Sequence, residues 1–130
     1  MQPTYFERFN GANRAHYFKQ LHSAEQPLLL ANVWDPKSAK QAEEAGYRAV
    51  GTSSAAISQM LGLNDGQGMT FDELFFFVER IIKHVAIPVS VDMEAGYAEN
   101  PAELGRNLQK LIDVGVSGIN IEDSLVVNKV

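Results

Sequence analysis

Three acidic residues stand at the ends of two short apolar runs, and they are the strongest chemical signal in the sequence. Asp92 and Glu94 follow residues 87–91, and Glu122 follows residues 118–121. If both runs are neighbouring parallel strands, their ends lie roughly 5 Å apart at one edge of a sheet. Ligands of parallel α/β proteins gather at this edge because its loops can vary while the scaffold stays fixed. The three carboxylates can therefore converge on one ligand.

Carboxylates crowded in this way raise one another's pKa or bind a cation. The chain contains no cysteine, and an all-oxygen set of ligands favours a hard ion, Mg²⁺ first and Mn²⁺ next. The alternative is that the acids cap the following helices or pair with loop lysines. Because three acids stand at two strand ends, we favour the metal site.

Small residues follow another apolar run and suggest a site for an anion. We expect Ser53-Ser54-Ala55-Ala56 to form a turn after that strand. Hydroxyls and backbone amides in such a turn can bind the carboxylate of a substrate. Serines are also common in turns that bind nothing, so both interpretations stay open.

A repeated order of strand and helix must position these residues. Short apolar runs alternate with capped helical segments that end at glycine, which is typical of βα units and a parallel sheet. We expect strands at 28–32, 47–52, 87–92 and 118–122, and helices at 35–46, 70–84 and 100–115. A further amphipathic helix is expected at 5–21, before the first strand.

Composition excludes several classes of protein. Hydrophobic residues make up 45% of the chain and charged residues 21%, which is enough for a globular core. The net charge is −5 and no basic stripe is present, so we expect neither a nucleic-acid nor a membrane partner. We see no secretory signal and no apolar run long enough to cross a bilayer, and we expect a cytoplasmic protein.

Five ordered blocks resemble the isocitrate lyase and phosphoenolpyruvate mutase superfamily. They cover about residues 27 to 124 and are Asn32-Val33-Trp34-Asp35 with Ser38-Ala39, Glu44-Ala45-Gly46-Tyr47 leading to Thr52-Ser53-Ser54, Leu61-Gly62-Leu63-Asn64-Asp65-Gly66, residues 88–97, and residues 118–123. The resemblance implies an α/β fold, the (β/α)₈ barrel of TIM type. It also implies a homo-oligomer, either a dimer or a tetramer.

The resemblance implies roles for individual residues. Asp92 is similar to the acid that binds Mg²⁺ most directly. The acids that hold the waters of the ion match Glu94, Glu122 and Asp65. The turn that binds the carboxylate of a 2-oxo acid matches Ser53, Ser54 and Ala55.

The implied activity is that of a Mg²⁺-dependent lyase or mutase. Such an enzyme cleaves or forms a C–C or P–C bond of a small 2-oxo acid or phosphonate through an intermediate like pyruvate enolate. Two features depart from the family. Its Asp-x-Asp is Asp92-Met93-Glu94 here, and the Cys-Gly-His loop of the lyases has no counterpart in residues 124–130. A decarboxylase, a hydrolase or a phosphonate enzyme is then as well supported as an isocitrate lyase, and the alternative is a non-catalytic or degenerate homologue that acts only through association with other chains.

The length of the chain limits what it can contain. A (β/α)₈ barrel needs about 250 residues, whereas this chain has 130. We therefore expect an N-terminal helical segment at 1–26, followed at 27–130 by the N-terminal half of a barrel, about four βα units, apparently truncated. We expect the chain alone to be incomplete for catalysis.

Overall fold

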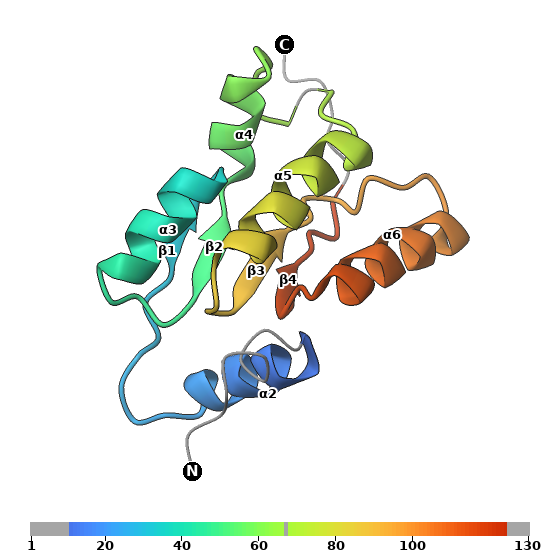
Figure 1. The fold of residues 1–130 in the computed structure, drawn as a ribbon. Coiled ribbons are helices and arrows are strands. Elements are labelled where there is room, and N and C mark those ends of the chain that lie inside the picture. The colour runs from blue at the N-terminus through green and yellow to red at the C-terminus, as the bar shows by residue number, and fades with distance from the viewer. Residues whose placement is uncertain (1–10, 67, 125–130) are drawn as a thin grey trace.

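The computed structural model describes residues 11–66 and 68–124 as a four-stranded parallel sheet with helices (Figure 1). The strands lie in the order of the chain, β1-β2-β3-β4. They are β1 (Ala31–Val33), β2 (Val50–Thr52), β3 (Val89–Asp92) and β4 (Gly118–Asn120). The helices are α2 (Gly11–His22), α3 (Pro36–Glu44), α4 (Ser54–Met60), α5 (Phe71–His84) and α6 (Pro101–Val114). The expected α/β fold of successive βα units is confirmed.

Side chains at the ends of the helices explain where three of them begin. The carboxylate of Asp35 accepts a hydrogen bond from the backbone N–H of Ser38 at 2.7 Å and caps α3. Thr70 caps α5 in the same way, because its hydroxyl accepts from the N–H of Glu73 at 3.1 Å. Asn100 caps α6, accepting from the N–H of Glu103 at 2.9 Å. These are the groups that satisfy the unpaired amides of a first helical turn.

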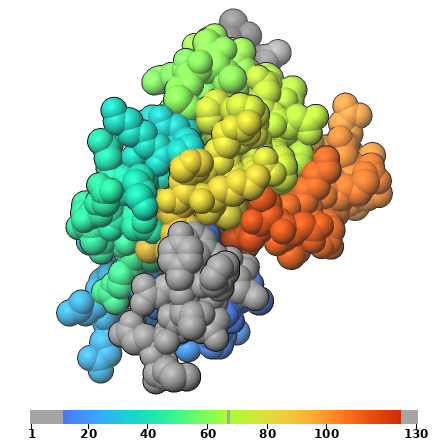
Figure 2. Space-filling view, viewed as in Figure 1, coloured from blue at the N-terminus to red at the C-terminus, as the bar shows by residue number. Residues whose placement is uncertain are grey.

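The two faces of the sheet differ in chemistry. Side chains of a strand alternate between faces, and the register of the strands places four buried valines on one face, Val33, Val50, Val89 and Val91. Helices α3, α5 and α6 cover this face, and in space-filling view they form one continuous layer (Figure 2). The opposite face carries small or polar residues at the alternating positions, Asn32, Gly51, Ser90 and Asp92.

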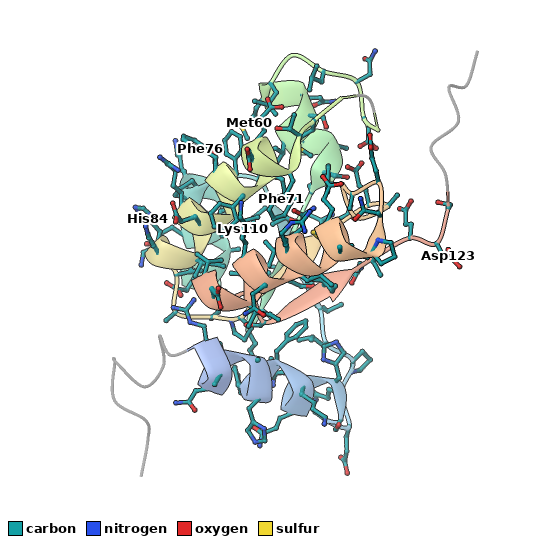
Figure 3. The ribbon with its side chains drawn as sticks, turned by 90° about the vertical axis from the view of Figure 1, so that its right-hand side faces the viewer. Met60, Phe71, Phe76, His84, Lys110 and Asp123 are labelled. Carbon is teal, nitrogen blue, oxygen red and sulfur yellow. The ribbon has the colours of Figure 1, made fainter. Side chains whose placement is uncertain are left out.

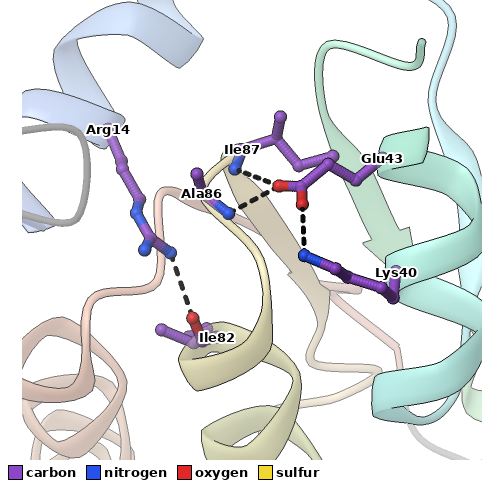
Figure 4. A network of polar contacts seen from close by, with 6 residues as sticks. All are labelled: Arg14, Lys40, Glu43, Ile82, Ala86 and Ile87. Carbon is purple, nitrogen blue, oxygen red and sulfur yellow. Dashed lines mark hydrogen bonds and ion pairs between the residues drawn. The ribbon is translucent and has the colours of Figure 1, made fainter. Parts of the chain in front are cut away.

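Helix α2 lies across the N-terminal ends of the strands (Figure 1). Its buried Arg14 donates from Nη1 to the backbone oxygen of Ile82 at 3.3 Å, near the end of α5 (Figure 4). Its Phe18 packs on the start of β4, where a Cβ added to Gly118 would lie 2.5 Å from the ring. This end of the sheet is therefore closed by packing and leaves the opposite end for a ligand.

A second polar contact fixes the start of β3. The Glu43 carboxylate accepts hydrogen bonds from the backbone N–H of Ala86 at 2.6 Å and of Ile87 at 3.4 Å, and it pairs with Lys40 at 3.2 Å (Figure 4). Because α3 precedes β2 and the segment 86–87 precedes β3, this carboxylate ties two successive βα units together.

The structure corrects the prediction for Ser53–Ala56. These residues do not form a small-residue turn but begin helix α4. Ser53 is its N-cap and accepts at Oγ from the N–H of Ala56 at 3.2 Å. The helix persists because it buries Ile57 completely in the core. The structure also has shorter strands than expected, and β1 begins three residues later than the predicted strand at 28–32.

The predicted N-terminal helix at 5–21 is confirmed over α2, and residues 5–10 lie outside the described residues. Across residues 11–66 and 68–124, no helix is both long and apolar enough to span a membrane.

Candidate functional site

Asp92 ends β3 on the face of the sheet that the helices leave uncovered. Its backbone N–H donates to the hydroxyl oxygen of the buried Thr52, at the end of β2, at 3.0 Å. Its Oδ1 accepts from the N–H of Glu94 at 3.0 Å. The backbone and one carboxylate oxygen are thus held by neighbours within the scaffold.

Ser54 connects Asp92 to a carboxylate from a different loop. The Ser54 hydroxyl lies 2.9 Å from Oδ2 of Asp92 and 3.4 Å from Oδ1 of Asp65. A serine hydroxyl has one hydrogen to donate, and the shorter distance favours Asp92 as its acceptor. The first residue of α4, the end of β3 and the loop after α4 therefore meet at one point.

Glu94 lies two residues beyond β3, with an unusual backbone angle φ of 47°. Its carboxylate accepts a hydrogen bond from the Tyr97 hydroxyl. Burial raises the pKa of the Glu94 carboxyl, the bond from Tyr97 opposes the rise, and the charges of Asp92, Asp65 and Glu122 add to it. Burial and the neighbouring Glu94 also raise the pKa of the Tyr97 hydroxyl. The charges of the other three predicted acids therefore all act on the Glu94 carboxylate.

Glu122 follows β4 and stays exposed. Its backbone N–H donates to the backbone oxygen of Glu94 at 2.6 Å, so the chain segments of the two acids lie side by side. Asp123 is also exposed, and it lies at the side of the molecule on the segment that leaves β4 (Figure 3). Of these two acids, Glu122 is the one whose charge raises the pKa of Glu94.

The structure uses Ser53 and Ser54 differently. The Ser53 hydroxyl caps α4, and its backbone N–H donates to the oxygen of Val33 at 2.9 Å. Ser54 and Ala55 lie in the first turn of α4, where backbone amides have no partner within the helix. The assignment of Ser53, Ser54 and Ala55 to a substrate carboxylate stays a prediction, with Ser54 nearest to the acids.

Sequence reasoning missed three residues that hold the acids in place. The sequence places Thr52 at the end of a strand and in a family block without giving it a role, and the structure shows that its hydroxyl binds the backbone of Asp92. Tyr97 holds the carboxylate of Glu94, and the buried Asn107 of α6 donates to the backbone oxygens of Gly96 and Tyr97, each at 3.2 Å. A polar residue among the apolar positions of a predicted helix was the one available signal for Asn107.

The arrangement of the four acids suits a cation that keeps several bound waters better than a cation bound by protein ligands alone. No three His, Asp or Glu side chains within the described ranges lie close enough to chelate a metal ion together. Mg²⁺ usually binds one or two protein carboxylates and keeps several waters. Asp92 and Asp65 share one hydroxyl, and a pocket of about 170 Å³ opens beside Glu94 and Tyr97. The donor set therefore fits Mg²⁺ by its chemistry.

Residues 18–129 match the family described as phosphoenolpyruvate phosphomutase. The chain belongs to this family. The resemblance to the phosphoenolpyruvate mutase and isocitrate lyase superfamily is thereby confirmed, and with it the fold as the N-terminal half of the (β/α)₈ barrel of the phosphomutase family.

Two curated members of the superfamily show the range of activities among relatives of this phosphomutase-family chain. The chain is 31% identical over 111 residues to 2-methylisocitrate lyase of Aeropyrum pernix, covering 85% of this chain and 36% of the lyase. It is 32% identical over 116 residues to oxaloacetate decarboxylase of Rhodopseudomonas palustris (strain BisA53), covering 88% of this chain and 39% of the decarboxylase. The chain thus spans less than half of the length of these relatives.

A solved structure supports the phosphomutase-family fold. Phosphonopyruvate hydrolase in complex with oxalate and Mg²⁺ superposes with a TM-score of 0.82 at 19% identity. The superposition covers 89% of this chain and 41% of the hydrolase. At this identity the likeness shows the shared fold.

Proposed function

We propose that this chain carries the magnesium and carboxylate site of an enzyme that acts on a small 2-oxo acid or phosphonate. The enzyme would make or break a C–C or P–C bond next to the carbonyl carbon. The observation that carries the proposal is the Ser54 hydroxyl, which lies within hydrogen-bond distance of both Asp92 and Asp65 at the carboxyl ends of the strands. The proposed substrate-binding residue Ser54, at the start of α4, and two candidate metal-binding acids are thereby within reach of one small ligand.

Each group has a place in this chemistry. Mg²⁺, when bound, supplies a Lewis acid that stabilises negative charge on the oxygen of an enolate. Asp92 would contact the ion, and Glu94, Glu122 and Asp65 would hold its waters. The amides of Ser54 and Ala55 would bind and orient the substrate carboxylate, as adjacent backbone amides can hold an anion, and the Ser54 hydroxyl would join them when it no longer donates to Asp92 or Asp65.

The relatives support a reaction of this class. Those at 31% and 32% identity are named 2-methylisocitrate lyase and oxaloacetate decarboxylase, and both names denote cleavage of a C–C bond. Mg²⁺ and oxalate occupy a protein of the same fold, and the all-oxygen donors of this chain suit the same ion.

Calorimetry on the full-length protein tests this proposal. Mg²⁺ should bind first, and oxalate, a mimic of pyruvate enolate, should then bind only in the presence of the ion. Succinate is the matched control, because it is also a dicarboxylate but lacks the adjacent pair of oxygens that chelates a metal. Absence of binding of Mg²⁺ and oxalate at millimolar concentration would contradict the proposal and favour a non-catalytic homologue.

A further inference from the structure

The segment that carries Glu94 is held in a conformation that its own sequence does not favour. Glu94 and Tyr97 have φ angles of 47° and 55°. Residues other than glycine rarely adopt positive φ, and such strain persists where the surrounding structure enforces it. Gly96, between them, packs so tightly on α6 that an added Cβ would lie 2.9 Å from Leu104. Contacts from α6, from α5, from the chain after β4 and from within the segment enforce it.

Asn107 supplies the contacts from α6. Its side chain is 8% exposed, and its amide nitrogen donates to the backbone oxygens of Gly96 and Tyr97. An asparagine amide has two N–H donors, so both are used on this segment. Asparagine is a poor residue for the middle of a helix, and a leucine would cost the helix less. Its presence here is explained by the segment it holds.

Tyr97 supplies the contact within the segment. Its hydroxyl donates to the Glu94 carboxylate, and its ring lies 6.4 Å from that of Phe71 between centroids. The ring is thereby supported by α5 while the hydroxyl fixes the direction of the carboxylate. On the other side, the backbone oxygen of Glu94 accepts from the N–H of Glu122.

We propose that Asn107 and Tyr97 are positioning residues that hold the Glu94 carboxylate toward Asp92 and Asp65, where a cation would bind. Asn107 fixes the strained backbone, and Tyr97 fixes the side chain that this backbone presents. The inference rests on the proposed function, because it takes Glu94 to hold water of a bound ion. Groups that orient the ligands of a metal typically change its affinity by 10- to 100-fold when removed.

Titration of the full-length protein with Mn²⁺, followed by electron paramagnetic resonance of the free ion, tests the inference without measuring turnover. Asn107→Leu and Tyr97→Phe should each weaken Mn²⁺ binding by about 10-fold or more. Asn100→Ala is the control for Asn107, since it removes another asparagine from α6, the N-cap. Tyr47→Phe is the control for Tyr97, because it removes a hydroxyl from a tyrosine that is 41% exposed and remote from the acids in sequence. Both controls should bind Mn²⁺ as the wild type does.

The possible outcomes separate this inference from the proposed function. Wild-type protein that does not bind Mn²⁺ overturns the proposed function and this inference with it. Wild-type protein that binds Mn²⁺, together with Tyr97→Phe and Asn107→Leu variants of unchanged affinity, overturns this inference alone. If Asn107→Leu fails to fold, Tyr97→Phe decides, because it removes a single hydroxyl and keeps the ring on Phe71.

Discussion

At the scale of single residues, Asp92 contributes more to the candidate site than to the fold. It is half-buried at the end of a strand, where its backbone is held by Thr52 and its carboxylate by Ser54 and Glu94. Replacing it with alanine removes the carboxylate but leaves the Thr52 contact to the backbone N–H. Loss of ligand binding therefore does not require loss of the strand.

We predict that Asp92→Ala abolishes Mg²⁺ binding and leaves the melting temperature within a few degrees of the wild type, as for other substitutions away from the core. Calorimetry measures the first effect and circular dichroism during heating the second. Asp72→Ala, an acid in the first turn of α5, is the control and should keep Mg²⁺ affinity. An unfolded Asp92→Ala protein would favour a structural role for the carboxylate.

The ionised carboxylate of Glu94 should lower the folding stability of the metal-free protein at neutral pH. Because its pKa is raised on folding, the folded state binds the proton more tightly than the unfolded state does. Stability is then lost as pH rises from the ordinary glutamate pKa, about 4.3, through the raised folded value. Glu94→Gln removes the charge and keeps an acceptor for Tyr97, so it should melt higher than the wild type at pH 7.

The same argument sets the pH at which this difference disappears. At about pH 3, well below the ordinary glutamate pKa, the wild-type carboxyl is protonated in both states, and the two proteins should melt alike. Thermal scans of chelator-treated protein across this range measure the difference. Equal stability at pH 7, or a difference that grows on acidification, would contradict the sign of the Glu94 shift.

At the scale of elements, local signals predicted helices α2, α3, α5 and α6 and missed α4. Helices α3, α5 and α6 begin at side chains whose cap bonds depend only on residues three positions apart. Helix α4 begins with Ser53-Ser54-Ala55-Ala56, which is also a common turn composition, and its helical state depends on burying Ile57 against other elements. The position of the acids at the strand ends could be predicted from the order of strands and helices. The contacts that hold the Glu94 segment could not, because they depend on how α6 packs against it.

The contact between α2 and β4 gives a prediction about packing. A methyl group at position 118 would lie 2.5 Å from Phe18, so Gly118→Ala should force the ring to move and destabilise the protein by about 1–3 kcal/mol. Gly105→Ala is the control, because nothing lies within 4 Å of the added Cβ in the middle of α6. It should stabilise the protein by about 0.5–1 kcal/mol.

Urea unfolding of the two glycine variants measures both free energies. Phe18→Leu combined with Gly118→Ala should recover part of the loss, since a smaller side chain leaves room for the methyl group, and contacting residues are expected to couple in this way. A Gly118→Ala variant as stable as Gly105→Ala would contradict the close packing of the Phe18 ring on Gly118.

At the scale of the whole molecule, the described sheet has two outer strands. β1 pairs only with β2, and β4 pairs only with β3, among the strands of residues 11–66 and 68–124. Large apolar side chains near these two strands are exposed, including Leu29 at 74% and Ile121 at 48%. In a closed (β/α)₈ barrel each strand has a neighbour on both sides. Unpaired strand edges with apolar side chains readily pair with another chain.

The 130-residue chain expressed by itself should therefore self-associate, with a sedimentation coefficient that rises with concentration. A lysine at an exposed sheet edge opposes such pairing, so Ile121→Lys, at the residue directly after β4, should shift the protein toward the monomer. Ile112→Lys is the control, because Ile112 is 65% exposed on α6 and away from the strand edges. Pairing at the edge of β4 should respond to the lysine at position 121 and not to the lysine at position 112. Equal effects of the two lysines in analytical ultracentrifugation would contradict edge pairing and point to general apolar exposure as the cause.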